Sequence, residues 1–273
     1  MAQIAASIII ILLTSFLFNR WMLENKIVKI PNLYFGFLFA LIASPLIYID
    51  NNIFTIISVL MMIMIYSESI KHGKSDNKIS IFNSGFLLGL MIILDYTLAV
   101  FYILLLFSLI HYTAFSIRNI LIQLLGGISS ILLYFLFVEI HVLQKEIIYQ
   151  PSANLDFAYL GFKTHPLLIL NISGLIILSK YELYNNYYKK TESAKKAFSL
   201  LTTLFSIILF YSLFCKSLKL IPFLIIPAVI IITNYLIYIQ QSKFRTFLLG
   251  LLIISFLLDF FLYEIWGSYF SWF

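Results

Sequence analysis

The chain is poor in charge and almost devoid of cysteine. Only 11% of its 273 residues are charged, against about 25% in a soluble domain, and 62% are hydrophobic. A water-soluble fold of this size cannot hide so much apolar surface, because even well-packed domains leave roughly a quarter of their surface exposed. The single cysteine, Cys215, excludes an intramolecular disulfide and a thiolate cluster. The lipid bilayer must therefore serve as part of the solvent.

Motifs of catalysis and cofactor binding are also absent from the sequence. It contains no GxSxG nucleophile, HExxH zinc helix, Walker loop or dinucleotide fingerprint. Two histidines, His72 and His111, are expected on the inner side of a membrane, and His141 and His165 on the outer side, so one metal cannot bind all four. A His141–His165 pair in the outer loop 139–165 is the remaining metal-binding alternative. We therefore predict no metal and no cofactor, and favour a role other than that of an enzyme.

Long apolar stretches predict the fold class. A helix needs about 20 apolar residues to cross the roughly 30 Å hydrocarbon core. The stretch 81–115 would be about 52 Å long as one helix, so it must break, and Asp95 at its centre marks the turn. The sequence thus predicts an all-α polytopic membrane protein with about ten transmembrane helices in a single domain, residues 1–273. Two of the expected segments, 53–66 and 81–94, are short enough to stop part way. The ten segments are 3–19, 33–49, 53–66, 81–94, 96–115, 119–138, 166–181, 198–214, 220–239 and 246–263.

The basic residues separate to one side of this arrangement. Of the 18 Lys and Arg residues, all but Lys145, Lys163, Lys216 and Lys219 fall in or beside turns on the same side. Because cytoplasmic loops are enriched in Lys and Arg, that side is predicted to be inside and both chain termini outside. No basic residue precedes the segment 3–19, which is expected to be a retained helix and not a signal peptide. The net charge of +6 has the same topological cause, so no nucleic-acid partner is expected.

Charged residues close to the spans are the first candidates for function, because charge is costly in lipid. Asp95, Glu139 and Asp259 are all expected near the outer ends of their helices. They predict an outward-opening cavity for a proton, a cation or a sugar hydroxyl. The alternative is that each carboxylate simply reaches water at the interface. Together with such a cavity, the segment 220–239, in which two prolines predict a kink, and the long loop 139–165 favour a flippase, polymerase or transporter.

The inner stretch 179–197 combines lysines with tyrosines at helical spacing. This pattern predicts an interfacial helix that lies on anionic lipid, with Lys189, Lys190, Lys195 and Lys196 as the lipid contacts. The simpler alternative is a basic inner loop with aromatic anchors. Membrane lipids are therefore the expected partners, and other inner-membrane proteins are further candidates.

Small residues predict close helix contact at two segments. Gly85 and Gly89 form a GxxxG motif. A second small-residue face consists of Gly126, Gly127 and Ser130. Glycine allows helix backbones to approach each other in lipid, and we interpret both segments as packing within the chain and not as dimerisation.

The region 53–126 also carries a characteristic order of motifs. After a Lys-rich inner loop, Phe-x-Ser-Gly begins a span, Phe-Ser-x-Arg occupies a turn, and Leu-Gly lies in the span that follows. The residues are Phe82, Ser84, Gly85, Phe115, Ser116, Arg118, Leu125 and Gly126. This order resembles an uncharacterised family of multi-pass inner-membrane proteins from the Bacteroidota, a domain of unknown function. The resemblance implies a cell-envelope location and no established activity, and it transfers no catalytic residue.

Some members of that family carry the label beta-carotene monooxygenase. That chemistry uses iron held by four histidines on a soluble β-propeller, whereas this sequence predicts helical spans with histidines on two membrane faces. The label therefore conflicts with the sequence.

Three functions are weighed on these grounds. The first is a non-catalytic subunit that packs with partner proteins in the bacterial inner (cytoplasmic) membrane, which the lack of motifs and the aromatic surfaces favour. The alternative is a flippase, polymerase or transporter for a lipid-linked or amphipathic envelope substrate. An integral-membrane glycosyltransferase is disfavoured, because the first outer loop is only Asp50-Asn51-Asn52.

Overall fold

The structure, a computed structural model, describes residues 2–25, 33–44, 46, 52–73, 78–112, 114–139, 166–215 and 219–262. Every regular element within these ranges is a helix, which confirms the expected all-α class. The α-helices are α1 (Ala2–Glu24), α2 (Tyr34–Ala43), α3 (Asn52–Ile70), α4 (Lys78–Leu94), α5 (Tyr102–His111), α6 (Ile117–Glu139), α8 (Pro166–Asn186), α9 (Glu192–Cys215), α10 (Ile225–Tyr238) and α11 (Ser242–Phe261). The 3-10 helices are η2 (Lys71–Gly73), η3 (Tyr96–Phe101), η5 (Tyr187–Lys189) and η6 (Ile221–Leu224).

Seven of these helices are long and apolar enough to cross a membrane, namely α1, α3, α6, α8, α9, α10 together with η6, and α11. The chain is therefore a membrane-embedded protein. The helix α3 is longer than the expected segment 53–66, whereas α2 has only 10 residues, about 15 Å, and is shorter than the expected 33–49. Each of the ten expected segments overlaps a helix, but that all ten cross the membrane remains a prediction.

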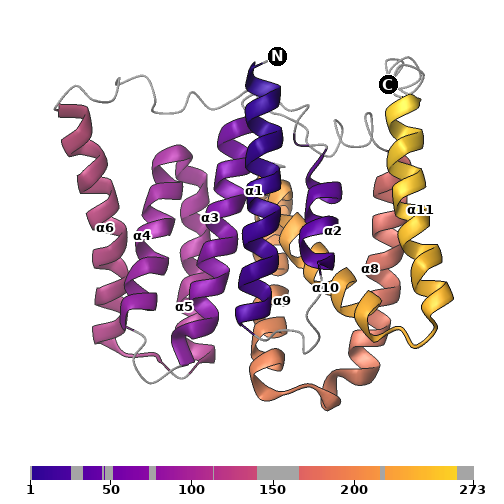
Figure 1. Ribbon diagram of the computed structural model, residues 1–273. Helices are drawn as coiled ribbons and strands as arrows, with labels where there is room; N and C mark the ends of the chain where they lie inside the picture. Colours follow the sequence, from indigo (N-terminus) through magenta and orange to yellow (C-terminus); the bar gives the residue numbers. More distant parts are fainter. Residues whose placement is uncertain are drawn as a thin grey trace.

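The helices stand side by side in a row (Figure 1). Following the contacts between neighbours, the order runs α6, α4, α3, α1, α2, α10, α8 and α11. Helices α5 and α9 pack against each other and join the two halves of the chain. Because consecutive helices alternate in direction, α1 begins and α11 ends at the same edge of the row (Figure 1).

The turns that carry most of the basic residues lie along the opposite edge. These turns follow α3, α5, α8 and α10 (Figure 1). The one-sided charge read from the sequence is therefore a feature of the assembled row as well. That this basic edge faces the cytoplasm remains a prediction from the positive-inside rule.

The break expected at Asp95 is confirmed. Helix α4 ends at Leu94, Asp95 is extended with φ −151° and ψ 117°, and η3 begins at the next residue. The chain then reverses direction and continues as α5 (Figure 1). The reversal follows from length, since one helix over 81–115 would exceed the hydrocarbon thickness.

The interfacial helix expected over 179–197 is not a single element. Its first part belongs to the end of α8, its middle is η5, and its last part is the start of α9. The helix ends because Lys190 is extended, with φ −80° and ψ 152°. The hydroxyl of Thr191 then accepts the backbone N–H of Ala194 at 3.4 Å and begins α9 as a cap.

One further expectation falls on residues outside the described ranges. It concerns the outer loop, of which residues 140–165, including His141 and His165, are not described.

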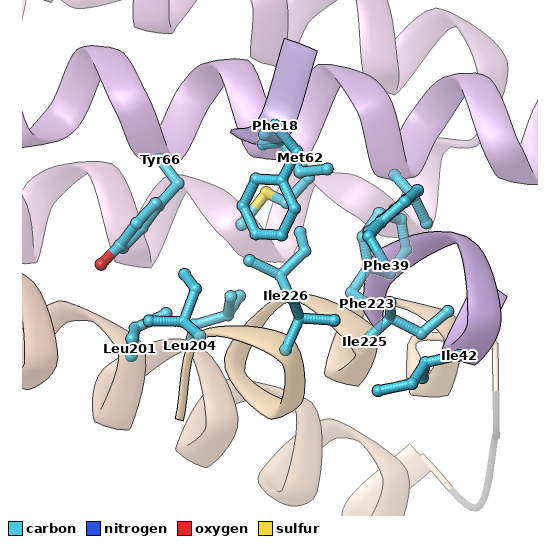
Figure 2. Close-up of a cluster of buried hydrophobic side chains, with 14 of the residues drawn as sticks. Phe18, Phe39, Ile42, Met62, Tyr66, Leu201, Leu204, Phe223, Ile225 and Ile226 are labelled. Carbon is cyan, nitrogen blue, oxygen red and sulfur yellow. The ribbon is translucent and has the colours of Figure 1, made fainter. Parts of the chain in front are cut away.

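The core lies where the two halves of the row meet. Figure 2 shows side chains of α1, α2 and α3 pointing toward those of α9, η6 and α10. The rings of Phe18 and Phe39 meet edge to face with centroids 5.5 Å apart. The hydroxyl of Tyr66 donates to the carbonyl of Ala197 at 3.1 Å and ties α3 to α9. At the centre, 67% of the apolar stretch containing α10 is buried, against 17% for α8 near the end of the row.

Candidate functional site

Asp95 serves the chain reversal between α4 and η3. One carboxylate oxygen, Oδ1, accepts the backbone N–H of Thr97 at 2.9 Å and the Thr97 hydroxyl at 2.7 Å. A carboxylate that accepts the free N–H groups of a helix start is a cap. This half-buried side chain therefore stabilises the turn at which it stands.

Asp259 joins two helices. It lies in α11, is fully buried, and accepts the backbone N–H of Leu168 at 2.8 Å and of Leu167 at 3.2 Å. Both N–H groups belong to the first turn of α8. The N–H groups of a first turn have no carbonyl acceptor within their own helix. The negative charge also suits the positive end of the helix dipole. One turn further on, the Asn171 amide donates to the Ser255 hydroxyl and makes a second link between the same helices.

Glu139 is the last residue of α6 and is exposed. Helices α6 and α11 stand at opposite ends of the row (Figure 1), so Glu139 and Asp259 lie far apart. The described residues thus place the three carboxylates in three separate settings and not around one outward cavity. The physical reason is that Asp95 and Asp259 are each engaged by the start of a helix in a different packing pair.

The glycines of α4 and α6 form the tightest helix contact of the fold. A Cβ added at Gly85 would overlap the backbone oxygen of Gln123, and one at Gly126 would lie 2.9 Å from the backbone nitrogen of Phe86. At Gly89 an added Cβ would meet the Gly127 oxygen at 2.5 Å. Both predicted small-residue faces therefore pack within the chain, and they pack against each other. We call this contact the glycine seam.

Buried polar side chains gather close to the basic end of the glycine seam. The Nδ1 of His72, in η2, lies 2.9 Å from the Ser108 hydroxyl of α5, and its Nε2 lies 3.4 Å from the Ser84 hydroxyl of α4. The Gln123 amide of α6 donates to Ser84 at 3.5 Å. All four side chains are at most 1% exposed. The cluster thus connects the four elements η2, α4, α5 and α6, and its two longer contacts are weak.

Sequence reasoning did not assemble this cluster. His72 was expected in an inner turn and Gln123 was a polar residue in a span, but no local spacing joins them. The available signal was only that buried polar groups in lipid seek partners.

The four lysines expected to contact anionic lipid differ in their surroundings. Lys195 pairs with Glu192 at 3.0 Å, and the ammonium of Lys196 lies over the Tyr112 ring, 5.7 Å from its centroid. Lys189 belongs to η5, but its side chain is outside the described part of the structure. Lys195 and Lys196 thus each have one partner within the chain at the basic edge, and Lys190 has several.

Lys190 reaches furthest into the protein. Its ammonium donates to Asn234 Oδ1 of α10 at 2.7 Å and lies over the rings of Phe198, at 5.0 Å, and Tyr238, at 4.8 Å. Burial lowers the pKa of Lys190, and the nearby Glu182 carboxylate opposes that shift. We call Lys190, Asn234, Phe198 and Tyr238 the lysine cluster. Among the candidate sites in the described ranges, it is the one in which a charged side chain, a buried amide and aromatic rings converge.

The remaining candidate chemistry is sparse. Among the residues that the structure describes, no group of three or more His, Cys, Asp and Glu side chains lies close enough to hold a metal ion. Cys215, at the end of α9, is exposed.

These features define a class of protein: a row of apolar helices in a membrane, fastened by a glycine seam, buried polar links and a capping carboxylate. Comparison with known proteins identifies the family. The model of a family of unknown function (DUF6427) matches residues 1–269, so the chain belongs to that family. Neither a curated protein nor a solved structure matches the chain.

Proposed function

We propose that this protein is a non-catalytic subunit that packs with partner membrane proteins of the cell envelope in the bacterial inner membrane. The main support for this proposal comes from the glycines. At six of the eight described glycines an added Cβ would lie within 4 Å of atoms of a neighbouring segment. At Gly174 and Gly250 it would meet no described atom within that distance. Those two glycines lie in α8 and α11, the helix pair at one end of the row.

An exposed glycine within an apolar helix needs a reason. Glycine destabilises a helix interior by about 0.5–1 kcal/mol relative to alanine. In the glycine seam that cost is offset by backbone contact, but Gly174 is exposed on α8 and has no such contact with the described part of the chain. A helix of another protein that approaches α8 at Gly174 supplies the missing contact.

The use of polar groups supports the same role. The His72 cluster, the Asn171–Ser255 pair and Asp259 each connect helices of this chain to one another. These polar side chains inside the spans thus hold the helices of the chain together, as we expect of a structural subunit.

The test compares two exposed positions. A tagged full-length chain is expressed at its native level, extracted from membranes in mild detergent, and analysed for proteins present at fixed stoichiometry. We expect wild type and Ala5→Leu to retain one membrane partner and Gly174→Leu to lose it. Ala5 is a matched control because it is a small, exposed residue in α1.

Two results decide against the subunit role. One is that wild type purifies without any stoichiometric membrane protein. The other is that Gly174→Leu retains the partner as fully as Ala5→Leu does. Size-exclusion profiles of both variants confirm that each chain is still folded.

The second candidate function is a flippase, polymerase or transporter for a lipid-linked or amphipathic substrate. The structure of α10 favours it. Pro222 begins η6 and Pro227 lies in the first turn of α10, so the most buried span starts as an irregular helix. Within that helix the buried Thr233 hydroxyl has no hydrogen-bond partner in the part of the chain that the structure describes. Lipid scrambling by purified protein in liposomes, measured by quenching of a labelled lipid, distinguishes this function from the first.

A further inference from the structure

We propose that the lysine cluster binds the phosphate of an anionic lipid headgroup, with Lys190 and Asn234 as the two donors. The proposal concerns a surface other than that of Gly174 and does not rest on the subunit role. The sequence predicted four equivalent lysine contacts with lipid, whereas this proposal places one specific binding site at Lys190.

Among the residues that the structure describes, the ammonium of Lys190 has fewer acceptors than it can use. It can donate three hydrogen bonds, and the structure provides one neutral acceptor, Asn234 Oδ1 at 2.7 Å, and two ring faces. A half-buried cation in such surroundings favours an anion, because charge-assisted hydrogen bonds are roughly twice as strong as neutral ones.

Asn234 supplies a second donor beside the first. An ammonium only donates, so the amide oxygen faces Lys190, and the nitrogen of the same amide remains as a further donor. That nitrogen, Nδ2, is buried and has no hydrogen-bond partner within the described ranges, in a side chain that is only 1% exposed. An unsatisfied buried N–H costs about 1–3 kcal/mol, which a phosphate oxygen recovers by accepting from it.

The position of the cluster suits a lipid headgroup. It lies at the basic edge of the row, where η5 follows α8 (Figure 1), and Tyr238 is 41% exposed at its rim. On α8, Tyr181 and Tyr184 are 72% and 83% exposed, and tyrosine favours the headgroup layer. The stretch 179–197 carries five lysines against two glutamates, so its field attracts anions.

The Glu182 carboxylate also acts on Lys190, and its Oε2 is buried without a hydrogen-bond partner among the residues that the structure describes. Its Oε1 accepts from the Asn186 amide at 3.0 Å, which holds that oxygen toward the α8 backbone. Its negative charge favours the protonated form of Lys190. Glu182 therefore keeps the ammonium charged for a phosphate that binds beside it.

The experiment uses the full-length chain in nanodiscs of phosphatidylcholine with graded amounts of phosphatidylglycerol. Native mass spectrometry after release counts the retained lipids. We expect one phosphatidylglycerol on wild type and on Lys195→Gln, and about tenfold weaker retention on Lys190→Gln. Both variants remove one positive charge from the same edge, so general attraction to anionic lipid predicts equal losses.

A second variant keeps the test valid if Lys190→Gln does not fold. Asn234→Asp is nearly isosteric and keeps an oxygen acceptor for Lys190, but it replaces the Nδ2 donor by a second oxygen. We expect a folded chain that retains no phosphatidylglycerol. Retention equal to that of wild type overturns the proposal.

Two further outcomes also overturn it. One is equal retention of phosphatidylglycerol and phosphatidylcholine by wild type. The other is displacement of the bound lipid by millimolar inorganic phosphate, which would identify a site for free phosphate and not for a lipid headgroup. If Lys190→Gln and Lys195→Gln lose equal amounts of bound phosphatidylglycerol, general surface charge explains the binding and the specific site is rejected.

Discussion

The glycine seam and the central core hold helices together in different ways. Along the seam, α4 and α6 meet through backbone atoms, so that a Cβ at Gly85 or Gly126 has no room. In the core, large side chains such as Phe18, Phe223 and Ile226 fill the space between helices that stand further apart (Figure 2). Lipid is as apolar as leucine, so neither contact is driven by the hydrophobic effect. The comparison shows that the glycine seam reaches shape complementarity through the absence of side chains, whereas the core reaches it through large side chains that interlock.

The largest effect is expected where atoms must be added to the seam. Gly89→Leu places a side chain against the Gly127 carbonyl and the Ser130 hydroxyl, and α4 and α6 must separate. We expect a loss of about 3 kcal/mol or more and little folded protein. Thermal unfolding in detergent, followed by circular dichroism, measures this. The matched control is Gly174→Leu, where an added Cβ meets nothing and the chain alone should stay as stable as wild type. Equal losses at the two glycines would remove the distinction between seam and surface.

A smaller effect is expected where atoms are taken from the core. Phe223 is 2% exposed and meets Phe101 edge to face, with ring centroids 5.0 Å apart. We expect Phe223→Ala to cost about 2 kcal/mol, below the ~3–5 kcal/mol of soluble cores, because the unfolded side chain lies in lipid and not in water. Phe223→Leu should recover most of the loss in the same unfolding measurement. If even Phe223→Leu prevents folding, the core is as intolerant as the seam.

The third prediction concerns the link between α11 and α8. Asp259→Leu leaves the N–H groups of Leu167 and Leu168 without their acceptor, and we expect a loss of about 1–2 kcal/mol. Asp259→Asn, which keeps one acceptor, should lose less. Glu139→Gln is the control, because Glu139 is exposed at the end of α6 and should leave the unfolding temperature unchanged. Growth of cells that carry Asp259→Asn adds a functional readout. A growth defect in a variant of unchanged stability would give Asp259 a role beyond packing.

The smallest effect is expected at the reversal after α4. Asp95→Ala removes the acceptor of the Thr97 N–H and hydroxyl, and we expect a loss of about 1 kcal/mol. Asp95→Asn should recover about half of it, since an amide oxygen also caps. The unfolding midpoints of the two variants measure this. An unchanged midpoint for Asp95→Ala would mean that the turn is held by the packing of η3 against α4 and not by its cap.

Local rules were enough for features that depend on length and residue type. The break at Asp95 followed from a stretch too long for the bilayer, and the packing role of Gly85 and Gly126 followed from their small size. The helix against which each small-residue face packs was not predictable, since the sequence of one segment does not indicate its partner. The partners of Asp259 were not predictable either, because its carboxylate oxygens accept from N–H groups that lie 91 and 92 residues away in the sequence.

The lysines show the same limit at the basic edge. Their number and their common edge of the row could be predicted from the sequence, but their different surroundings could not. Lys190 meets Asn234, 44 residues further along the chain, only because α10 passes beside the turn between α8 and α9. Lys195 pairs with Glu192, three residues before it, by contrast, which is a pair that helical spacing alone allows.

By itself the sequence determined that this chain is a helical membrane protein with its basic residues on one side. Apolar length and charge are properties of single segments, and the bilayer acts on each segment separately. Only the tertiary structure decided which glycines touch, which carboxylate caps which helix, and which lysine reaches a buried amide. Those outcomes depend on how ten helices are placed relative to one another, and contact between distant segments is decided by the packing of the whole row.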